Sequence, residues 1–273
     1  MAFSSSAVAF SALLCGIDPG WQAFLVAFIS VFLFFLQLRI ADEFKDAEED
    51  AKYRPYRAVP RGLVSLRELG VVFCLAAAVQ LLLTLWLDSR LLILLLVTWG
   101  YLALMSVEFF ARDWLKVRHI TYLWTHMMIM PLVDLFATSC LWLPASVKPD
   151  TTGLLFFLIA SFFNGIVIEI GRKIRQPDQE EEGVPTYSKL WGQKRAAIVW
   201  VGCMAVTATF AILAAVHIEF SLPVLCILVP LLIWSMWTAS QSHRMASKRF
   251  ELLAGLWTLA LYLSLGLIPL IFS

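Results

Sequence analysis

Apolar runs alternate with short polar stretches along the whole of this sequence. Nine such runs are separated from one another by charged residues or by Pro and Gly. A helix of about 20 apolar residues crosses the hydrocarbon core of a bilayer, so each run is predicted to be a transmembrane helix. The predicted spans are residues 1–16, 20–41, 67–88, 91–111, 119–143, 152–171, 195–217, 222–240 and 252–272. The first of them is shorter than a typical span.

The composition supports the same fold class. Of the 273 residues, 60% are hydrophobic and 15% are charged, whereas soluble domains carry about 25% charged residues. The net charge of +1 provides no general attraction to nucleic acid. No basic residues precede the first run, which argues against a signal peptide, and the five cysteines, all in apolar runs, are expected to be buried free thiols. We therefore predict an all-α integral membrane protein, a nine-helix bundle forming a single transmembrane domain over residues 1–273.

The basic residues are distributed unevenly between the two sides of such a bundle. Lys and Arg number 7, 3, 6 and 3 in the polar stretches after the second, fourth, sixth and eighth spans, and these are 19 of the chain's 21. The stretches are residues 39–67, 112–118, 172–195 and 244–249. Arg90 and Lys148 alone fall on the other side. By the positive-inside rule the four basic stretches are cytoplasmic, and a bacterial inner membrane is the expected location.

Three acids in the first long loop fall at even spacing. Asp42, Asp46 and Asp50 are four residues apart, so in a helix that continues past the second span they form one stripe, drifting about 40° per step. Like charges at this spacing repel one another and weaken a helix. A bound divalent cation would relieve the repulsion, and carboxylate oxygens suit Mg²⁺, with Mn²⁺ as a substitute. Glu43 and Glu49 flank the stripe and are further acidic candidates.

Arginines follow the acids in "YRPYRAVPRG". Arg54, Arg57 and Arg61 carry guanidinium groups, whose planar forks match phosphate oxygens. Carboxylates followed by guanidiniums suggest a diphosphate held through Mg²⁺. The spacing alone is equally compatible with an ordinary helix end whose charges compensate one another.

Several motifs resemble those of the UbiA superfamily of intramembrane prenyltransferases. "DEFKDAEED" is similar to the first acidic motif of that family, and "YRPYRAVPRGLVS" to the Arg-Pro element that follows it, with Ala58 where the family usually has Pro. "LKVR", which contains Lys116, resembles the basic element after the fourth helix. "EEGVPTYSKLWG" resembles the run after the sixth helix, with Trp191 inserted before Gly192. The family also has nine helices.

This resemblance implies a fold, a substrate and a set of site residues. The fold would be a helical bundle in which two cytoplasmic loop regions cover a lipid-open cavity. An isoprenyl diphosphate would bind with its head under these loops, and its allylic carbocation would be captured after the diphosphate leaves. The implied metal ligands are Asp42, Asp46 and Asp50, and Glu169 joins them as a catalytic candidate. The implied diphosphate-binding residues are Arg57, Arg61, Lys116, Arg172, Lys173 and Arg175.

The second long loop departs from the family pattern. Its sequence is "EIGRKIRQPDQEEEG", from Glu169 to Gly183. Basic residues stand in its first half, where the family has a second acidic motif. In one interpretation Glu169, with Asp178 or Glu180, supplies carboxylates in a shifted register. In the other, the bases Arg172, Lys173 and Arg175 replace a metal ion and bind the diphosphate directly.

Polar residues inside the predicted spans are functional candidates by default. Asp134 follows Pro131, which should free a backbone carbonyl, and it is expected either to line the cavity or to pair with His126. Asn164 lies on roughly the same side of the sixth span as Glu169, the catalytic candidate. Glu108 and Arg112 have the four-residue spacing of a helical ion pair.

Three functions remain open at this level. The first is a Mg²⁺-dependent prenyltransferase that uses an isoprenyl diphosphate and a lipophilic acceptor, with an aromatic ring as the expected class. The second is a terpene cyclase of the same superfamily, in which the cation attacks its own double bonds. The third is a transporter or divalent-cation permease, although such proteins place charged sites near the middle of the membrane.

Overall fold

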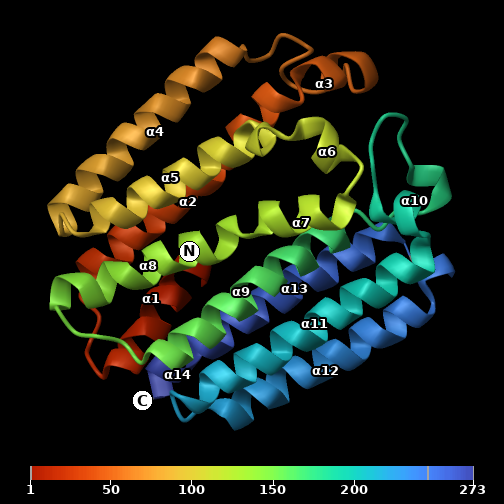
Figure 1. The fold of residues 1–273 in the computed structure, drawn as a ribbon. Helices are drawn as coiled ribbons and strands as arrows, with labels where there is room; N and C mark the ends of the chain where they lie inside the picture. The colour runs from red at the N-terminus through yellow and green to blue at the C-terminus, as the bar shows by residue number, and fades with distance from the viewer. Residues whose placement is uncertain (1, 245, 273) are drawn as a thin grey trace.

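The computed structural model describes residues 2–244 and 246–272, and the regular elements in these ranges are helices (Figure 1). Met1, where the first predicted span begins, lies outside the described residues. The apolar helices are α1 (Ala2–Cys15), α2 (Trp21–Lys45), α4 (Leu66–Leu87), α5 (Leu91–Ser106), α7 (His119–Met127), α8 (Ile129–Ala145), α9 (Thr151–Arg172), α11 (Gln193–Val216), α12 (Ser221–Ser240), α13 (Ser247–Leu265) and α14 (Leu267–Phe272). Shorter polar helices follow some of them: α3 (Ala47–Tyr53), α6 (Arg112–Lys116) and α10 (Tyr187–Trp191).

Seven of the nine predicted spans have the length and composition needed to cross a membrane. The other two correspond to α1 and α5, which have 14 and 16 residues. At 1.5 Å per residue they rise about 21 and 24 Å, less than the hydrocarbon thickness of about 30 Å. The all-helical, multi-pass membrane fold is therefore confirmed, whereas nine spans of full length are not.

Two of the predicted spans are interrupted near their loop ends. Residues 119–143 form α7 and α8 instead of one helix, because Pro131 has no N–H to donate to the carbonyl of Met127. The predicted span 91–111 ends early, at Ser106. Beyond it Glu108 begins three consecutive residues with φ values of 49°, 54° and 57°, a left-handed conformation that no right-handed helix can include.

The four basic loops meet at one end of the bundle, which we call the loop end; α3, α6 and α10 all lie there (Figure 1). Lys116 Nζ, from the second of these loops, is 3.1 Å from Glu49 Oε1 in the first. The first loop reaches the third through Tyr56, whose hydroxyl donates to Glu181 at 2.7 Å. The third reaches the fourth through Gln176, whose amide donates to the Ser242 carbonyl at 2.9 Å. The shared side predicted from the charges is thus present.

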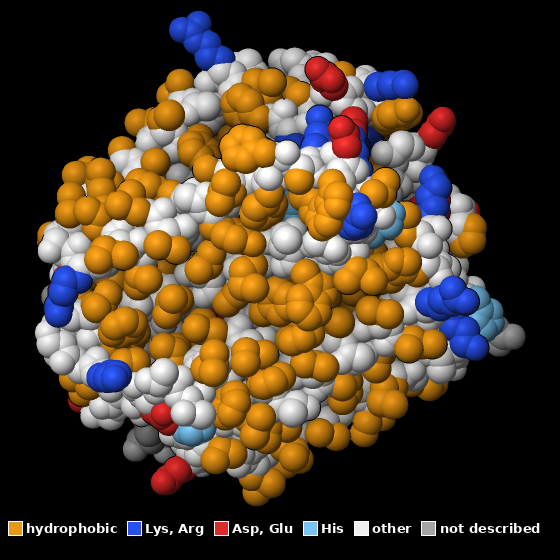
Figure 2. All heavy atoms as spheres, in the orientation of Figure 1, with side chains coloured by type: hydrophobic (Ala, Val, Ile, Leu, Met, Phe, Trp, Pro, Cys, Tyr) orange, Lys and Arg blue, Asp and Glu red, His pale blue; other side chains and the backbone are white. Residues whose placement is uncertain are grey.

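Hydrophobic side chains cover the middle of the molecule, and charged ones gather toward its two ends (Figure 2). Large apolar residues such as Ile93, which is 69% exposed, lie on this surface. An apolar belt of this kind suits contact with lipid. The expectation that all five cysteines are buried is wrong. They are free thiols, but Cys74 and Cys226 are exposed, whereas Cys140 is buried.

The short helix α1 is held inside the bundle, where it packs against α2, α8, α13 and α14. Its closest approach is at Gly266, the residue that separates α13 from α14. A Cβ atom added at Gly266 would lie 2.1 Å from the carbonyl oxygen of Ser6 and 2.5 Å from its Cα. Both are backbone atoms, which cannot turn aside as a side chain can, so only glycine fits this crossing.

We expect Gly266→Ala to destabilise the protein by about 1–3 kcal/mol, the usual cost of overpacking a tight contact. Thermal unfolding of the purified protein in detergent would measure it. Gly202→Ala is the matched control, because a Cβ there meets no atom within 4 Å. Equal stability of the two variants would contradict the close approach.

Candidate active site

The aspartate stripe continues in helical register beyond the end of α2. The backbone N–H of Asp46 donates to the Asp42 carbonyl at 2.9 Å, that of Asp50 to Asp46 at 2.8 Å, and that of Arg54 to Asp50 at 2.9 Å. Asp46 stands at the joint between α2 and α3, with φ −95° and ψ 4°. The three carboxylates therefore leave the helix axis at successive turns, as their spacing predicts.

The three aspartates have different surroundings. The half-exposed Asp42 has Lys45 as its partner, with Nζ 3.5 Å from Oδ1. Asp50 is only 1% exposed, with Arg54 Nη2 2.6 Å from Oδ1 and Arg57 against Oδ2. Asp46 is partly buried and has no ion pair or side-chain hydrogen bond among the described residues. Burial raises the pKa of Asp46, an effect that nearby Lys45 opposes and the neighbouring aspartates reinforce.

Arg57 joins the two ends of the acidic segment. One of its guanidinium nitrogens contacts Asp50, and the other lies 3.0 Å from Glu43 Oε1. Glu43 also pairs with Arg39 one turn earlier. The guanidinium of Arg57 thus neutralises acids on both sides of Asp46.

Within the described residues, no three His, Cys, Asp or Glu side chains are grouped so that they could hold a metal ion. The donors that fit Mg²⁺ best are Asp42 and Asp46, because one is half exposed and the other has no ion pair. A metal ion prefers such carboxylates to one that is already neutralised. Asp50 would become a ligand only after Arg54 and Arg57 had moved away from it.

The basic end of α9 is built around Glu169. Its two oxygens are each 2.7 Å from a cation, Oε2 from Arg172 and Oε1 from Lys173. Further along the loop, Arg175 Nη1 is 3.1 Å from Glu181 Oε1. The hydrogen bond from Tyr56, together with Arg175, holds the pKa of Glu181 below its ordinary value. Each of these three bases therefore already has an acidic partner, although Arg172 and Lys173 share one carboxylate.

The carboxylates of the shifted-register interpretation lie elsewhere. Asp178 is exposed in the short turn Pro177–Gln179. Glu180 accepts hydrogen bonds from the hydroxyls of Thr186 at 2.7 Å and Ser188 at 2.9 Å, so it braces its own loop. Neither has a contact with Glu169 in the part of the chain that the structure describes.

A group of side chains lies between the acidic end of α2 and the basic end of α9. The sequence pattern did not predict that these residues form a group. We call it the inner polar cluster: Lys45, Tyr122, His126, Lys173 and Tyr187. Lys45 donates to the Tyr122 hydroxyl at 3.0 Å, and the His126 ring stacks on Tyr122 with centroids 3.8 Å apart. Lys173 Nζ is 5.9 Å from the centre of the Tyr187 ring. One signal was available, because Tyr122 and His126 are four residues apart in a helix.

The remaining diphosphate candidates lie nearer the surface. Arg61 is exposed, and its side chain has no ion pair within the described ranges. Lys116 is half exposed and is paired with Glu49, which Arg112 also approaches at 3.7 Å. These bases would be reached by a ligand from the loop side.

The intramembrane polar residues form pairs, but one pair differs from the expected one. Asp134 is fully buried and accepts a 2.6 Å hydrogen bond from Tyr262, so the expected pairing with His126 is wrong. Asn164 is also buried, and it accepts from Thr258 at 3.1 Å.

The predicted ion pair between Glu108 and Arg112 is present, with 3.8 Å between Oε2 and Nε. Glu108 is buried beside the inner polar cluster, and its other oxygen is 4.0 Å from Lys45 Nζ. The pair therefore links the left-handed segment after α5 to the end of α2.

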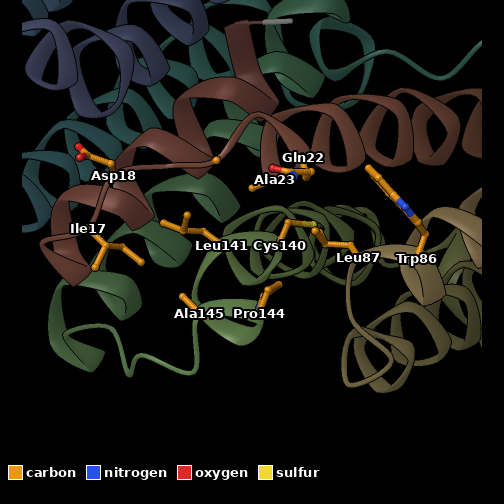
Figure 3. A pocket seen from close by; sticks show the side chains of 11 residues that line it. Ile17, Asp18, Gln22, Ala23, Trp86, Leu87, Cys140, Leu141, Pro144 and Ala145 are labelled. Carbon is orange, nitrogen blue, oxygen red and sulfur yellow. The ribbon is translucent and has the colours of Figure 1, made fainter.

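Two cavities open into the bundle. One of about 420 Å³ lies at the end away from the basic loops, and Asp18, Gln22, Trp86 and Leu141 are among the residues that line it (Figure 3). The other, about 490 Å³, runs between α1, α9 and α13. It extends from Arg172 at the loop end to Tyr262 inside the membrane and is walled mainly by apolar residues. Of these two cavities, the second reaches a base of the candidate site, Arg172.

We expect Asp50→Ala to lower the free energy of unfolding by about 3 kcal/mol. This is the lower end of the range for removing one partner of a buried ion pair, because Arg54 and Arg57 keep partial solvent access. The matched variant Asp42→Ala should cost less than about 1 kcal/mol, as its pair is half exposed. Thermal unfolding, with hydrogen exchange over residues 47–64, would compare them. Equal losses would contradict the assignment of Asp50 as the anchor of this loop.

Comparison with known proteins adds the family. The family described as "UbiA prenyltransferase family" matches residues 3–259, which is nearly the whole chain. Searches of curated proteins and of solved structures found no match. The matched range includes both long loops, the inner polar cluster and most of the residues that line the second cavity. The chain belongs to the UbiA prenyltransferase family.

Proposed function

We propose that the protein is a Mg²⁺-dependent intramembrane enzyme that ionises an isoprenyl diphosphate and transfers the prenyl group to a lipophilic, aromatic acceptor. Membership of the family implies prenyl transfer, an isoprenyl diphosphate substrate and a general dependence on Mg²⁺. The observation that carries the finer proposal is the unbroken register of Asp42, Asp46 and Asp50 at the loop end. We place the loop end in the cytoplasm, following the charge asymmetry.

Asp42 and Asp46 are the proposed first metal ligands, and Asp50 supports them through Arg57. When bound, Mg²⁺ would supply positive charge to the departing diphosphate. Asp50 and Glu43 hold Arg57 beside the proposed metal ligands, where its guanidinium can also face phosphate oxygens. The acidic half of the site would thus combine metal ligands with a guanidinium.

The basic half would bind the diphosphate without a second metal ion. Lys173 and Arg172 are held at the end of α9 by Glu169, and Arg175 by Glu181. Cations fixed in this way stabilise developing negative charge without reorganising during the reaction. Arg61 and Lys116 would complete the binding from the loop surface. This arrangement favours replacement of the second acidic motif by bases over a shifted register.

The cavity between α1, α9 and α13 is the proposed place for the prenyl chain. Its apolar walls run from Arg172 into the membrane, so a lipophilic chain there would have its charged head at the loop end. A cavity without water also protects an allylic cation from hydrolysis.

A terpene cyclase is the second candidate function. It is favoured by the basic second loop, which departs from the acidic pattern of the family. The transporter alternative is set aside, because the family is one of enzymes.

The decisive experiment is incubation of the purified protein with Mg²⁺ and geranyl, farnesyl or geranylgeranyl diphosphate, with and without 4-hydroxybenzoate as an aromatic probe. We expect diphosphate release, with a prenylated product when the acceptor is present. Asp46→Ala should lower release at least about 100-fold, because charge stabilisation of this kind is worth several kcal/mol. Glu48→Ala is the control, since Glu48 is exposed on the same helical segment. A cyclic hydrocarbon without acceptor would instead indicate the cyclase, and no release with any donor would refute both enzymes.

Metal affinity should depend on pH through Asp46. The raised pKa means that this carboxyl holds its proton to a higher pH than an ordinary aspartate. Because Mg²⁺ binds the carboxylate form, its affinity should rise as pH increases through this raised pKa and level off above it. Isothermal titration with Mg²⁺ across the acidic range would follow this step. The step should disappear in Asp46→Asn and persist in Glu48→Gln, and an unchanged profile in Asp46→Asn would exclude Asp46 as the titrating ligand.

A further inference from the structure

His126 in the inner polar cluster has a defined tautomer. Its Nδ1 is 2.9 Å from the backbone carbonyl oxygen of Tyr122. A carbonyl can only accept a hydrogen bond, so Nδ1 carries the hydrogen and, in the neutral ring, Nε2 carries a lone pair. A backbone carbonyl at this position holds both the tautomer and the orientation of the ring.

The free nitrogen is buried without a partner. His126 is 6% exposed, and Nε2 has no hydrogen-bond partner among the described residues. Leaving a buried acceptor without a hydrogen bond destabilises the folded protein. Such a group in a native structure calls for an explanation, and a role in proton transfer is one.

The surroundings of His126 connect it to both halves of the site. On one side Lys45 lies within electrostatic reach, and on the other Glu169 and Lys173 do. Rings enclose it as well: Tyr122 is stacked on it, and Phe109 approaches edge-on with 6.1 Å between centroids. The imidazole thus stands between the end of α2, which carries the proposed metal ligands, and the end of α9, which carries the bases. In the proposed function the diphosphate binds between these two helix ends.

We propose that His126 Nε2 is the general base that removes a proton from the acceptor during prenyl transfer. The proposal rests on the proposed function. The bond between C1 of the prenyl group and the diphosphate oxygen breaks, and its electron pair leaves with the diphosphate. An electron pair of the acceptor ring then forms the new bond to C1. The proton displaced from that ring carbon goes to Nε2, while Nδ1–H stays bonded to the Tyr122 carbonyl.

The charges around the ring suit a temporary proton carrier. An imidazolium here would lie in a buried site, with Lys45 and Lys173 as like charges and Glu169 as an opposite charge within reach. The proton is therefore not held permanently, and it passes to the departing diphosphate, which carries the matching negative charge. No oxidant, reductant or further reactant is required, and the ring returns to its neutral form for the next turnover.

The test separates ionisation from proton removal. Full-length wild type, His126→Asn and His126→Ala are incubated with Mg²⁺, farnesyl diphosphate and 4-hydroxybenzoate, and released diphosphate and prenylated product are measured separately. Asn can still donate to the Tyr122 carbonyl but cannot act as a base. We expect product to fall about 100-fold or more, the usual contribution of a general base, while diphosphate release falls far less. Added imidazole should restore part of the product in His126→Ala.

The control is His119→Asn. His119 is the first residue of α7, the helix that also carries His126, and this variant should behave as wild type. Product formation by His126→Asn at the wild-type rate would overturn the proposal. So would an equal fall in product and diphosphate release that imidazole does not restore, since this indicates a structural role. If wild type itself releases no diphosphate, the proposed function fails together with this inference, and that outcome is recognised from the wild type alone.

Discussion

Asp50 is a buried carboxylate held between two arginines, and the architecture of the loop end depends on this interaction. Arg54 comes from the next turn of the helix and Arg57 from the loop beyond it, so their pairing with Asp50 folds the chain back onto α3. Arg57 then reaches Glu43 on α2. A charge in a low-dielectric region must be paired or solvated, and here the pairing fixes the path of the loop. The consequence for chemistry is that Asp46, between these pairs, keeps its carboxylate free.

The same ions serve the fold and the proposed substrate site. Glu169 pairs with both Arg172 and Lys173, and Glu181 pairs with Arg175, so part of the positive charge of the basic half is balanced within the protein. A diphosphate with its Mg²⁺ would offer these cations stronger partners than single carboxylates. Binding is then an exchange of ion pairs and not the burial of new charge, which avoids most of the desolvation cost of bringing a polyanion to a membrane protein. Long Arg and Lys side chains make such an exchange possible without moving a helix.

Some features of this structure could be predicted from the sequence, because they depend on residues close together along the chain or on the charge of whole loops. The register of the aspartate stripe, the pair of Glu108 with Arg112 and the clustering of the basic loops all follow from spacing and charge. Features that depend on which helices touch could not be predicted. The partner of Asp134 is Tyr262, 128 residues away, and glycine is needed at 266 because the backbone of α1 at Ser6 passes against it. The inner polar cluster was missed for the same reason, since its members come from four separate segments.

An asymmetric site is a consistent solution to the charge problem of prenyl transfer. The leaving diphosphate needs positive charge on more than one side. A metal ion can provide this charge on a given side if the carboxylates there outnumber the bases that pair with them. On the α2 side Asp42 and Asp46 meet this condition. On the α9 side the bases are part of the protein, so a second metal ion would be repelled by Lys173 and Arg172. The base proposed for the acceptor then has to stand where neither half dominates, and His126 lies between them, near Lys45 at the end of α2 and near Glu169 and Lys173 at the end of α9.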